Sequence, residues 1–384
     1  MDFSLNDHQK LIRDTVRQFM ENEVRPSVKQ RDREGRFAAA EIQKLAELGC
    51  CGMLMPEEWG GPGLDAISYV LMIEEVARVD AAMATSLSVT NSAVQVPLLT
   101  FGSYAQKKKY LHRLAGGEIL GSFCLTEPQA GSDAAGLQAR ATRAAAGSSD
   151  APYVLSGTKT WVSNGSVADV FIVFAKTDPD GGGKGITAFL VEPGFKGFRV
   201  GRHEEKMGQH SSPSVEIVLN DCEVPAENRL GDEGQGLKIA LSALDNGRIG
   251  IAAQAVGVAQ GALEAAAAFA KQRRAFGKNI AEFQAIQWML ADMQTEIEAA
   301  RGLVYHAAWL KDSGGRMGSA ASKAKLYASE MANRVAAKAV QIHGSVGYSR
   351  ETDVERIYRD ARVMTIYEGT SEIQRVIIAR ELGL

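Results

Sequence analysis

The spacing of apolar residues changes twice along this chain, and that change constrains the fold more than any other feature. After about residue 231, apolar residues recur every three or four positions from Ile286 to Ala308 and again from Ala324 to Ile342, which predicts two long amphipathic helices. The run 249–270 is rich in small residues and predicts a third helix that can approach its neighbours closely. A shorter terminal helix completes a predicted four-helix bundle.

The middle of the chain has a different pattern. Short runs rich in β-branched and aromatic residues, such as "YVLSGTKTWVSNG" and "DVFIVFAKT", are separated by Gly, Asn, Asp and Pro. In "SVEIVLN" the apolar residues Val215, Ile217 and Leu219 alternate with their neighbours, as in a strand with one buried face. No long helical pattern interrupts these runs, so we expect a mostly antiparallel sheet, folded as a small barrel or sandwich.

The first 120 residues read as helical again, with Ile12, Val16 and Phe19 on one turn-spaced row. A chain of 384 residues is also too long for one compact core. The sequence therefore predicts an α+β multi-domain protein with an all-α domain at 1–120, a β domain at 121–230 and a helical bundle at 231–384.

Composition excludes several classes of function. The net charge of -3 gives no support for a nucleic-acid partner. The four cysteines and six histidines have neither disulfide-framework nor metal-ligand spacing, so we expect no metal. No apolar stretch reaches the length expected of a membrane span, and no G-x-G-x-x-G follows a strand. The N-terminus lacks signal and transit character, so we expect a cytoplasmic bacterial protein or a mature mitochondrial-matrix one.

A lone carboxylate near the C-terminus needs an explanation. In "MTIYEGTSEIQR" Glu368 stands between a tyrosine and Gly369, just before the last helix. Ser371 and Gln374 have capping-box spacing, so that helix is predicted to begin at Ser371. Taken alone, Glu368 would be a solvated loop residue near the positive end of a helix. Alternatively, it is a base held on a short glycine hinge.

Several longer motifs decide between these interpretations. The segments "FCLTEPQAGSDAAGL" (123–137), "GTKTWVSNG" (157–165), "RRAFGKNIAEFQAIQ" (273–287), "QIHGSVGY" (341–348) and "RDARVMTIYEGTSEIQR" (359–375) occur in this order. Together they resemble the acyl-CoA dehydrogenase family, and "LDNGRIGIAAQ" (244–254) is most similar to its short-chain, butyryl-type members. Ser345 and Val346 depart from the family pattern, which puts small details of the flavin-site loop in doubt.

The resemblance implies a reaction and its participants. A flavin, FAD in this family, accepts the hydride from Cβ of an acyl-CoA because no amino acid can. Glu368 would be the base that removes the Cα proton, and the N–H of Gly369 or of Glu368 would bind the thioester carbonyl. An electron-transfer flavoprotein would take the electrons. The alternatives are an acyl-CoA oxidase that uses oxygen and a non-catalytic acyl-CoA-binding protein.

The resemblance also assigns binding residues. Those implied for FAD are Phe123, Leu125, Thr126, Gly131, Ser132, Trp161, Val162, Ser163, Arg273, Phe276, Gln284, Gln341, Ile342, His343, Gly344, Thr370, Ser371 and Glu372. Those implied for the substrate are Ser132, Asp245, Asn246, Gly247, Arg248 and Gly369. Residues 341–344 would reach the FAD of a neighbouring subunit, so a homo-oligomer, expected to be a tetramer, follows.

The likeness to short-chain members suggests a straight acyl group of roughly four to six carbons, with a broad profile because a pocket discriminates poorly by one methylene. Gly247 would leave space near the thioester that could admit a short α-branch. Filling that space with leucine is therefore expected to depress activity on branched substrates more than on straight ones.

Overall fold

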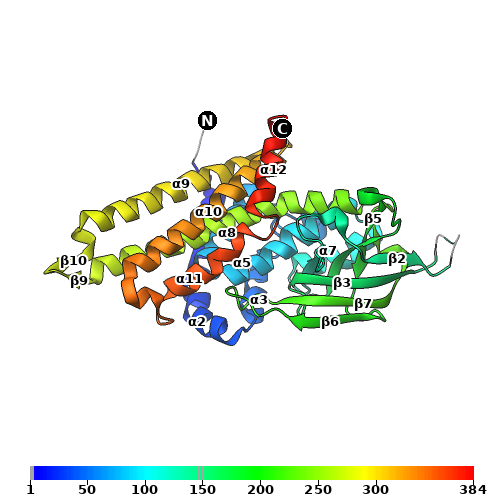
Figure 1. Cartoon of the computed structure of the whole chain (residues 1–384), viewed down its shortest axis with the longest axis horizontal. Coiled ribbons are helices and arrows are strands. Elements are labelled where there is room, and N and C mark those ends of the chain that lie inside the picture. The colour runs from blue at the N-terminus through cyan, green and yellow to red at the C-terminus, as the bar shows by residue number, and fades with distance from the viewer. Residues whose placement is uncertain (1–3, 146–147, 149) are drawn as a thin grey trace.

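The structure is a computed structural model that describes residues 4–145, 148 and 150–384. The first three residues, on which part of the N-terminal expectation rests, lie outside this range. Helices fill one side of the molecule and the sheet fills the other, and the long helix α8 (Gly236–Gln272) extends from the sheet into the helical side, where it ends at β9 and β10 (Figure 1).

Helices precede the sheet, as the apolar pattern predicts. They are α1 (Asp7–Phe19), α2 (Arg25–Glu34), α3 (Ala39–Glu47), α4 (Ala66–Val79), α5 (Ala81–Ser88), α6 (Val96–Phe101) and α7 (Tyr104–Ala115), with π-helical turns at η1 (Met20–Val24) and η3 (Val89–Gln95) and a 3-10 turn at η2 (Glu57–Trp59). Asn6 caps α1 by accepting from the N–H of Gln9 at 2.8 Å. Val16 is buried in the core, as its row predicts.

The strands follow. They are β1 (Gly121–Cys124), β2 (Arg140–Arg143), β3 (Tyr153–Ser163), β4 (Val170–Lys176), β5 (Ile186–Val191), β6 (Phe198–His203), β7 (Ser214–Val224) and β8 (Arg229–Leu230), with 3-10 turns at η4 (Ala134–Gly136), η5 (Gly182–Gly185) and η6 (Ala226–Asn228). The hydrogen-bonded order is β6-β7-β3-β2-β4-β5-β8, and β1 also pairs with β4.

The expectation of an antiparallel sheet is right for most pairs and needs one correction. Both β1 and β2 run parallel to β4, so the sheet is mixed. Parallel neighbours need long connections. Here the connection from β1 to β4 contains the loop "LTEPQAGSD" (125–133), which the resemblance assigns to the flavin and which we call the flavin loop, and the β2–β3 hairpin. The pattern of apolar residues does not reveal which strands such a long connection places side by side.

The sheet is buried on both faces at β4. Ile172 and Phe174 point to a core shared with α6, α7 and α8, whereas Phe171 and Val173 point to a core built from the strands themselves. In β7, Val215, Ile217 and Leu219 face that second core, which confirms the predicted alternation.

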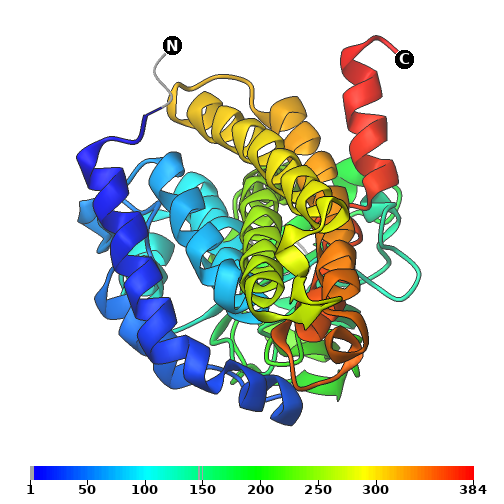
Figure 2. The same cartoon turned by 90° about the vertical axis from the view of Figure 1, so that its left-hand side faces the viewer.

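The last part of the chain is the predicted helical bundle. Its elements are α8, the β9 (Arg274–Ala275) and β10 (Lys278–Asn279) hairpin, η7 (Ile280–Glu282), α9 (Gln284–Asp312), α10 (Gly318–His343), η8 (Gly344–Tyr348), α11 (Asp353–Ala361), η9 (Arg362–Thr365) and α12 (Ser371–Glu381). The helix α11 was not expected. Figure 2 shows α8, α9 and α10 side by side, with α12 standing at their edge.

Small residues let α8 lie close to α4, as predicted. A Cβ built on Gly257 would lie 2.2 Å from the carbonyl oxygen of Glu74, and one on Gly261 would lie 2.3 Å from that of Arg78. The expectation that no apolar stretch reaches the length of a membrane span needs correction, because α8 is long and apolar enough to cross a membrane by length and composition alone. However, 83% of its most apolar window is buried inside the protein, as in the core helix of a globular fold.

Candidate active site

Glu368 occupies a strained turn between η9 and α12. Its φ is +56° and that of Gly369 is +90°, so two consecutive residues adopt left-handed backbone conformations. Such conformations cost a non-glycine residue free energy and tend to persist where function requires them. Thr370 caps α12 by accepting from the N–H of Ile373 at 3.4 Å. The predicted capping box at Ser371 is therefore wrong, although the helix does begin at Ser371.

Side chains from three helices hold the carbonyls of this turn. Gln374 of α12 donates to the carbonyl oxygens of Glu368 at 3.1 Å and of Gly369 at 2.9 Å, which explains why it makes no capping box. Arg248 of α8 donates to the Glu368 carbonyl at 3.4 Å, and Lys325 of α10 donates to the Gly369 carbonyl at 2.7 Å. These bonds hold the backbone of the turn through its carbonyl oxygens. The side chain of Glu368 and the N–H groups of the turn take no part in them.

The carboxylate of Glu368 lies against Gly247. A Cβ built on Gly247 would come within 2.6 Å of Oε2 and 2.8 Å of Oε1, so only glycine leaves room for the carboxylate in this position. Oε2 is buried and has no hydrogen-bond partner among the described residues. Burial raises the pKa of Glu368 to about 7, against the opposing positive charges of Arg248 and Lys325. An unpartnered carboxylate that titrates near neutrality can act as a general base.

Two backbone donors stand beside the carboxylate. Within the part of the chain that the structure describes, the N–H groups of Glu368 and Gly369 donate no hydrogen bond. Backbone N–H groups that are fixed in place suit a carbonyl oxygen that gains negative charge during a reaction.

A buried chain of hydrogen bonds adjoins Glu368 at Tyr367. Tyr367 donates to Gln254 of α8 at 2.8 Å, Gln254 donates to Thr85 of α5 at 2.7 Å, and Thr85 donates to Gln209 at 2.7 Å. Gln209 belongs to the loop between β6 and β7. These hydrogen bonds therefore connect the N-terminal helices, the sheet region and the bundle to Tyr367, the residue before Glu368. Satisfied buried polar networks of this kind rigidify the surrounding structure.

The loop of "LTEPQAGSD" is fixed by a buried ion pair. The Lys159 ammonium lies 2.7 Å from Oε1 of Glu127 and also donates to the carbonyl of Leu125 at 3.2 Å. The Glu127 carboxylate accepts from the N–H groups of Gln138 at 2.6 Å and Ala139 at 3.0 Å. The carbonyl of Thr126 accepts from Thr160 at 2.9 Å, which joins the loop to β3. Neither Glu127 nor Lys159 was predicted as a site residue.

The loop leaves an open edge. Gly131 and Ser132 are exposed, and a Cβ on Gly131 would meet nothing within 4 Å. Phe123 is half-buried and packs on Phe174 with ring centroids 5.0 Å apart. Backbone groups and hydroxyls of this loop are therefore available to a ligand placed along β1 and β3.

Trp161 is turned outward by an irregularity in β3. The register between β3 and β7 shifts between Lys159 and Val162, and Trp161 has φ +57° and is 59% exposed. Bulges are common beside active sites because they re-aim a side chain. Trp161 is thus available for stacking and is not a core aromatic. Val162 is buried in the sheet core, so it can reach a cofactor only through its backbone, while Ser163 is half-buried.

Thr370, Ser371 and Glu372 lie at the start of α12 beside Glu368, whereas another group of predicted cofactor residues lies at the β9–β10 end of the bundle. Arg273 and Phe276 sit on the exposed β9–β10 end, and Gln284 begins α9 beside it (Figure 1). His343 stacks on Phe269 with ring centroids 4.3 Å apart, which places the end of α10 there too. Gln341 and Gly344 are exposed at that end, whereas Ile342 is buried in the core. A single chain does not bring this second group to Trp161 and Glu368.

The predicted substrate residues of α8 are partly used within the protein. Arg248 is buried and forms an ion pair with Asp245 at 2.6 Å, besides holding the Glu368 carbonyl. Asn246 is buried, and its Nδ2 donates to the Ser242 carbonyl at 2.9 Å. Gly247 and Gly369 lie at the Glu368 turn. Ser132 lies on the flavin loop. Because Asp245, Asn246 and Arg248 bond within the protein, their contact with substrate stays a prediction.

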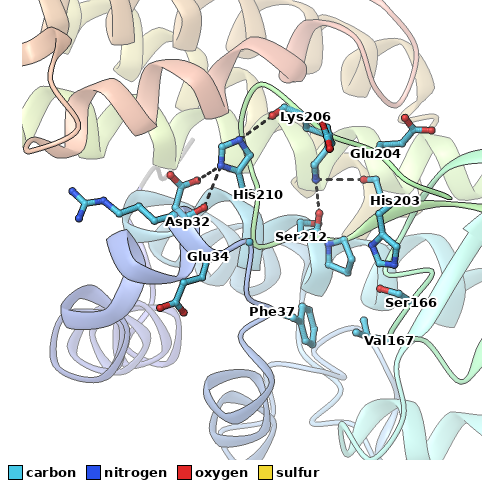
Figure 3. A pocket seen from close by; sticks show the side chains of 15 residues that line it. Asp32, Glu34, Phe37, Ser166, Val167, His203, Glu204, Lys206, His210 and Ser212 are labelled. Atoms are coloured by element: carbon cyan, nitrogen blue, oxygen red, sulfur yellow. Dashed lines mark hydrogen bonds and ion pairs between the residues drawn. The ribbon is translucent and has the colours of Figure 1, made fainter.

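A cavity of about 600 Å³ lies elsewhere, between α2 and the loop from β6 to β7 (Figure 3). His210 lies 3.2 Å from Asp32, and the Lys206 ammonium donates to the carbonyls of Gln209, at 2.8 Å, and of Ser212. These charged groups are engaged in holding the loop, and none of the predicted site residues lines the cavity. Glu368 and Gly247 therefore mark the candidate site.

The polar and aromatic groups predicted for the cofactor have a chemistry that fits a flavin. An exposed indole, loop donors at Gly131 and Ser132, and a buried Ser371 hydroxyl that lacks a partner match a planar ring with one polar edge. Thr370 and Ser371 start α12, and its N–H groups favour anionic or polar ligand atoms. Among the described residues, no group of three or more His, Cys, Asp or Glu side chains could hold a metal ion.

Family models match the chain along nearly its whole length. They are the acyl-CoA dehydrogenase N-terminal domain at residues 6–118, the middle domain at 122–222 and the C-terminal domain at 234–383. The chain belongs to the acyl-CoA dehydrogenase family. The predicted resemblance and three-part fold are thereby confirmed.

Individual relatives of this acyl-CoA dehydrogenase agree. The short-chain specific acyl-CoA dehydrogenase of Megasphaera elsdenii is 47% identical, with 98% of each chain covered. The solved structure of butyryl-CoA dehydrogenase from that organism is 46% identical, with a TM-score of 0.97 and 100% of each chain covered. The subunit CarC of the caffeyl-CoA reductase-Etf complex of Acetobacterium woodii is 44% identical, with 97% of this chain and 98% of that one covered.

Several residues that build this acyl-CoA dehydrogenase site were missed from the sequence. Lys325, Gln254 and Lys159 are all buried, and each is a polar residue within a run that the pattern assigns to a buried helix face or strand. A buried polar residue in an apolar run is a detectable signal. Its partner is not, because the partner comes from another element.

Proposed function

We propose that this enzyme carries out the FAD-dependent α,β-dehydrogenation of a short-chain acyl-CoA to the trans-2-enoyl-CoA. Glu368 is the base that removes the Cα proton, and electrons pass to an electron-transfer flavoprotein. The observation that carries this proposal is the buried, unpartnered Oε2 of Glu368 packed against Gly247. A carboxylate in that environment gains most by accepting a proton.

Different residues have different roles in the proposed reaction. The N–H groups of Glu368 and Gly369 bind the thioester oxygen and stabilise the charge that develops there when Cα loses its proton. FAD, when bound, accepts the hydride from Cβ. Trp161 and the loop held by Glu127 and Lys159 orient that cofactor, and the small side of α8 at Gly247 leaves the acyl group access to the carboxylate.

Relatives support the cofactor and the partner. FAD is the cofactor of this family, and one neighbour of this chain is described in its title as "PigA with FAD and proline". The name of the Acetobacterium woodii relative places it in a complex with Etf, which supports an electron-transfer flavoprotein as partner here. That name also describes a reductase, so the same site could serve the reverse direction in other relatives. The cytoplasmic or mitochondrial-matrix location stays a prediction.

The activity is tested with the purified flavoprotein and acyl-CoA thioesters, with and without an electron acceptor. We expect butyryl-CoA and hexanoyl-CoA to bleach the flavin under air, with colour returning when an electron-transfer flavoprotein is added. The optimum should fall at roughly four to six carbons, with a gradual decline on either side. Rapid reoxidation by air indicates an oxidase, absence of bleaching indicates a binding protein, and an optimum at dodecanoyl-CoA contradicts the short-chain assignment.

The separation of the two groups of cofactor residues gives a prediction about assembly. We propose that Arg273, Phe276 and residues 341–344 complete the FAD site of a neighbouring subunit in a homotetramer. Phe276 is 95% exposed in the single chain, so its ring is available to a neighbouring subunit. Phe276→Ala combined with Arg273→Ala is expected to lower FAD content without changing far-UV circular dichroism. A fully FAD-loaded monomer in sedimentation experiments would contradict this arrangement.

A further inference from the structure

Lys325 is a charged residue in a row of small buried ones. It lies on α10 between Ala324 and Ala328, and all three residues are fully buried. Burying a lysine opposes folding unless the charge is compensated. The only acceptor found for its ammonium among the described residues is the carbonyl oxygen of Gly369, at 2.7 Å. An ammonium has three donors, so one carbonyl does not account for it.

The compensating charge is the base. Burial lowers the pKa of Lys325 to about 8, and the negative charge of Glu368 opposes that shift. In turn, Lys325 and Arg248 are the positive charges that oppose the burial of Glu368. Arg248 already has Asp245 as a partner at 2.6 Å, whereas Lys325 has no ion-pair partner within 4 Å among the described residues. Of the two positive charges near Glu368, Arg248 is therefore paired with another carboxylate, and Lys325 is not.

We propose that Lys325 is a positioning residue for the proton transfer: its ammonium fixes the Gly369 carbonyl and keeps the Glu368 carboxylate ionised at the working pH. The hydrogen bond fixes the hinge so that the side chain of Glu368 lies over Gly247. The charge acts across the hinge on the carboxylate itself. This inference rests on the proposed role of Glu368 as the base.

Other titratable groups face the same region. Around Lys325 they are Glu368, Arg248, Glu372 and Glu330. Around Glu368 they also include Tyr69 of α4 and Tyr367, and burial holds the pKa of Tyr69 near 12 and raises that of Tyr367 further. Both tyrosines stay neutral where the enzyme works, and Glu372 is exposed to solvent. Between pH 6 and 8 the local charge is thus governed by the titration of Glu368 and Lys325.

The test is a direct titration of Glu368 in the holoenzyme. Infrared difference spectra report the protonated carboxyl group, and Glu368→Gln assigns the band. In Lys325→Gln, which removes the charge, we expect the pKa of Glu368 to rise by about one unit or more. The acid limb of the pH profile for kcat should move upward by the same amount, with KM nearly unchanged. Lys325→Arg keeps the charge and should restore a pKa close to that of the parent.

Lys323 provides a matched control on the same helix. It is exposed and pairs with Glu381 at 2.6 Å, so Lys323→Gln removes one positive charge of α10 without touching the hinge. Its infrared titration should equal that of the parent. If Lys325→Gln folds and loses activity equally at every pH while the pKa of Glu368 stays constant, the role is structural and the proposal is overturned.

A second measurement leaves Lys325 intact, in case its variants do not fold. Coupling between two sites is reciprocal, so Glu368→Gln should lower the pKa of Lys325, which is followed by NMR of the holoenzyme labelled with ¹³C at lysine Cε. An unchanged lysine titration overturns the proposal. Failure of the proposed function gives a different result, namely Glu368→Gln that keeps its turnover.

Discussion

Glu368→Gln is expected to lower turnover by about three orders of magnitude or more, because among the described residues we find no second carboxylate facing it that could take the Cα proton. Gly247 occupies the facing position on α8 and has no side chain. Glutamine has nearly the same shape as glutamate, so the hinge, the fold and the FAD content should be unaffected. Single-turnover bleaching of the flavin by butyryl-CoA, measured by stopped flow, isolates the step in which the proton is removed.

The pH dependence supplies the control for this variant. The pKa of Glu368 is raised to about 7, and the base must be ionised, so the rate in the parent enzyme should rise through pH 7 and level off above it. That limb should be absent from the residual rate of Glu368→Gln. Glu381→Gln, at the exposed end of α12, should behave as the parent does. Turnover of Glu368→Gln within about tenfold of the parent would rule out the role of base.

Gly247→Ala and Gly247→Leu are expected to depress activity on every acyl-CoA, straight or branched. A Cβ at residue 247 would lie 2.6–2.8 Å from the carboxylate atoms of Glu368, far inside van der Waals contact, so the carboxylate must move. A displacement of about 1 Å in a catalytic group can cost about a hundredfold in rate, and leucine should cost more than alanine. The measurement is kcat/KM for butyryl-, isobutyryl-, hexanoyl- and dodecanoyl-CoA.

This expectation replaces the one drawn from sequence, in which leucine at residue 247 affects branched substrates selectively. Gly302→Ala is the matched control, because it lies on α9, where a Cβ would meet nothing within 4 Å. That variant should keep full activity. If Gly247→Leu loses isobutyryl-CoA but keeps butyryl-CoA, the glycine shapes the acyl pocket and the carboxylate adapts, contrary to the geometry described above.

Local pattern determined the elements of this protein. The three-to-four spacing from Ile286 to Ala308 specifies α9, and the alternation at Val215, Ile217 and Leu219 specifies the inner face of β7. Both follow from which residues of a regular element share one face, which depends only on positions close together in the sequence. The motifs, read through their family, also identified Glu368 and the flavin loop.

Other features could not be read from any local pattern. The capping box at Ser371 and Gln374 is a plausible local solution, yet Gln374 donates instead to the carbonyls of Glu368 and Gly369, which Arg248 and Lys325 also hold. Likewise, nothing near β1 or β2 reveals that both lie parallel to β4. In both cases the outcome depends on how the folded chain arranges its groups, and not on the pattern of one helix or strand.

Only the tertiary structure decided the surroundings of the proposed base, Glu368. Arg248 and Glu368 are 120 residues apart in the sequence, and the packing of α8, α10 and α12 brings Gly247, Lys325 and the hinge together. The sequence determined that a carboxylate is present and that glycine follows it. Its pKa depends on burial and on charges carried by other helices, and these are properties of the folded surroundings and not of any segment.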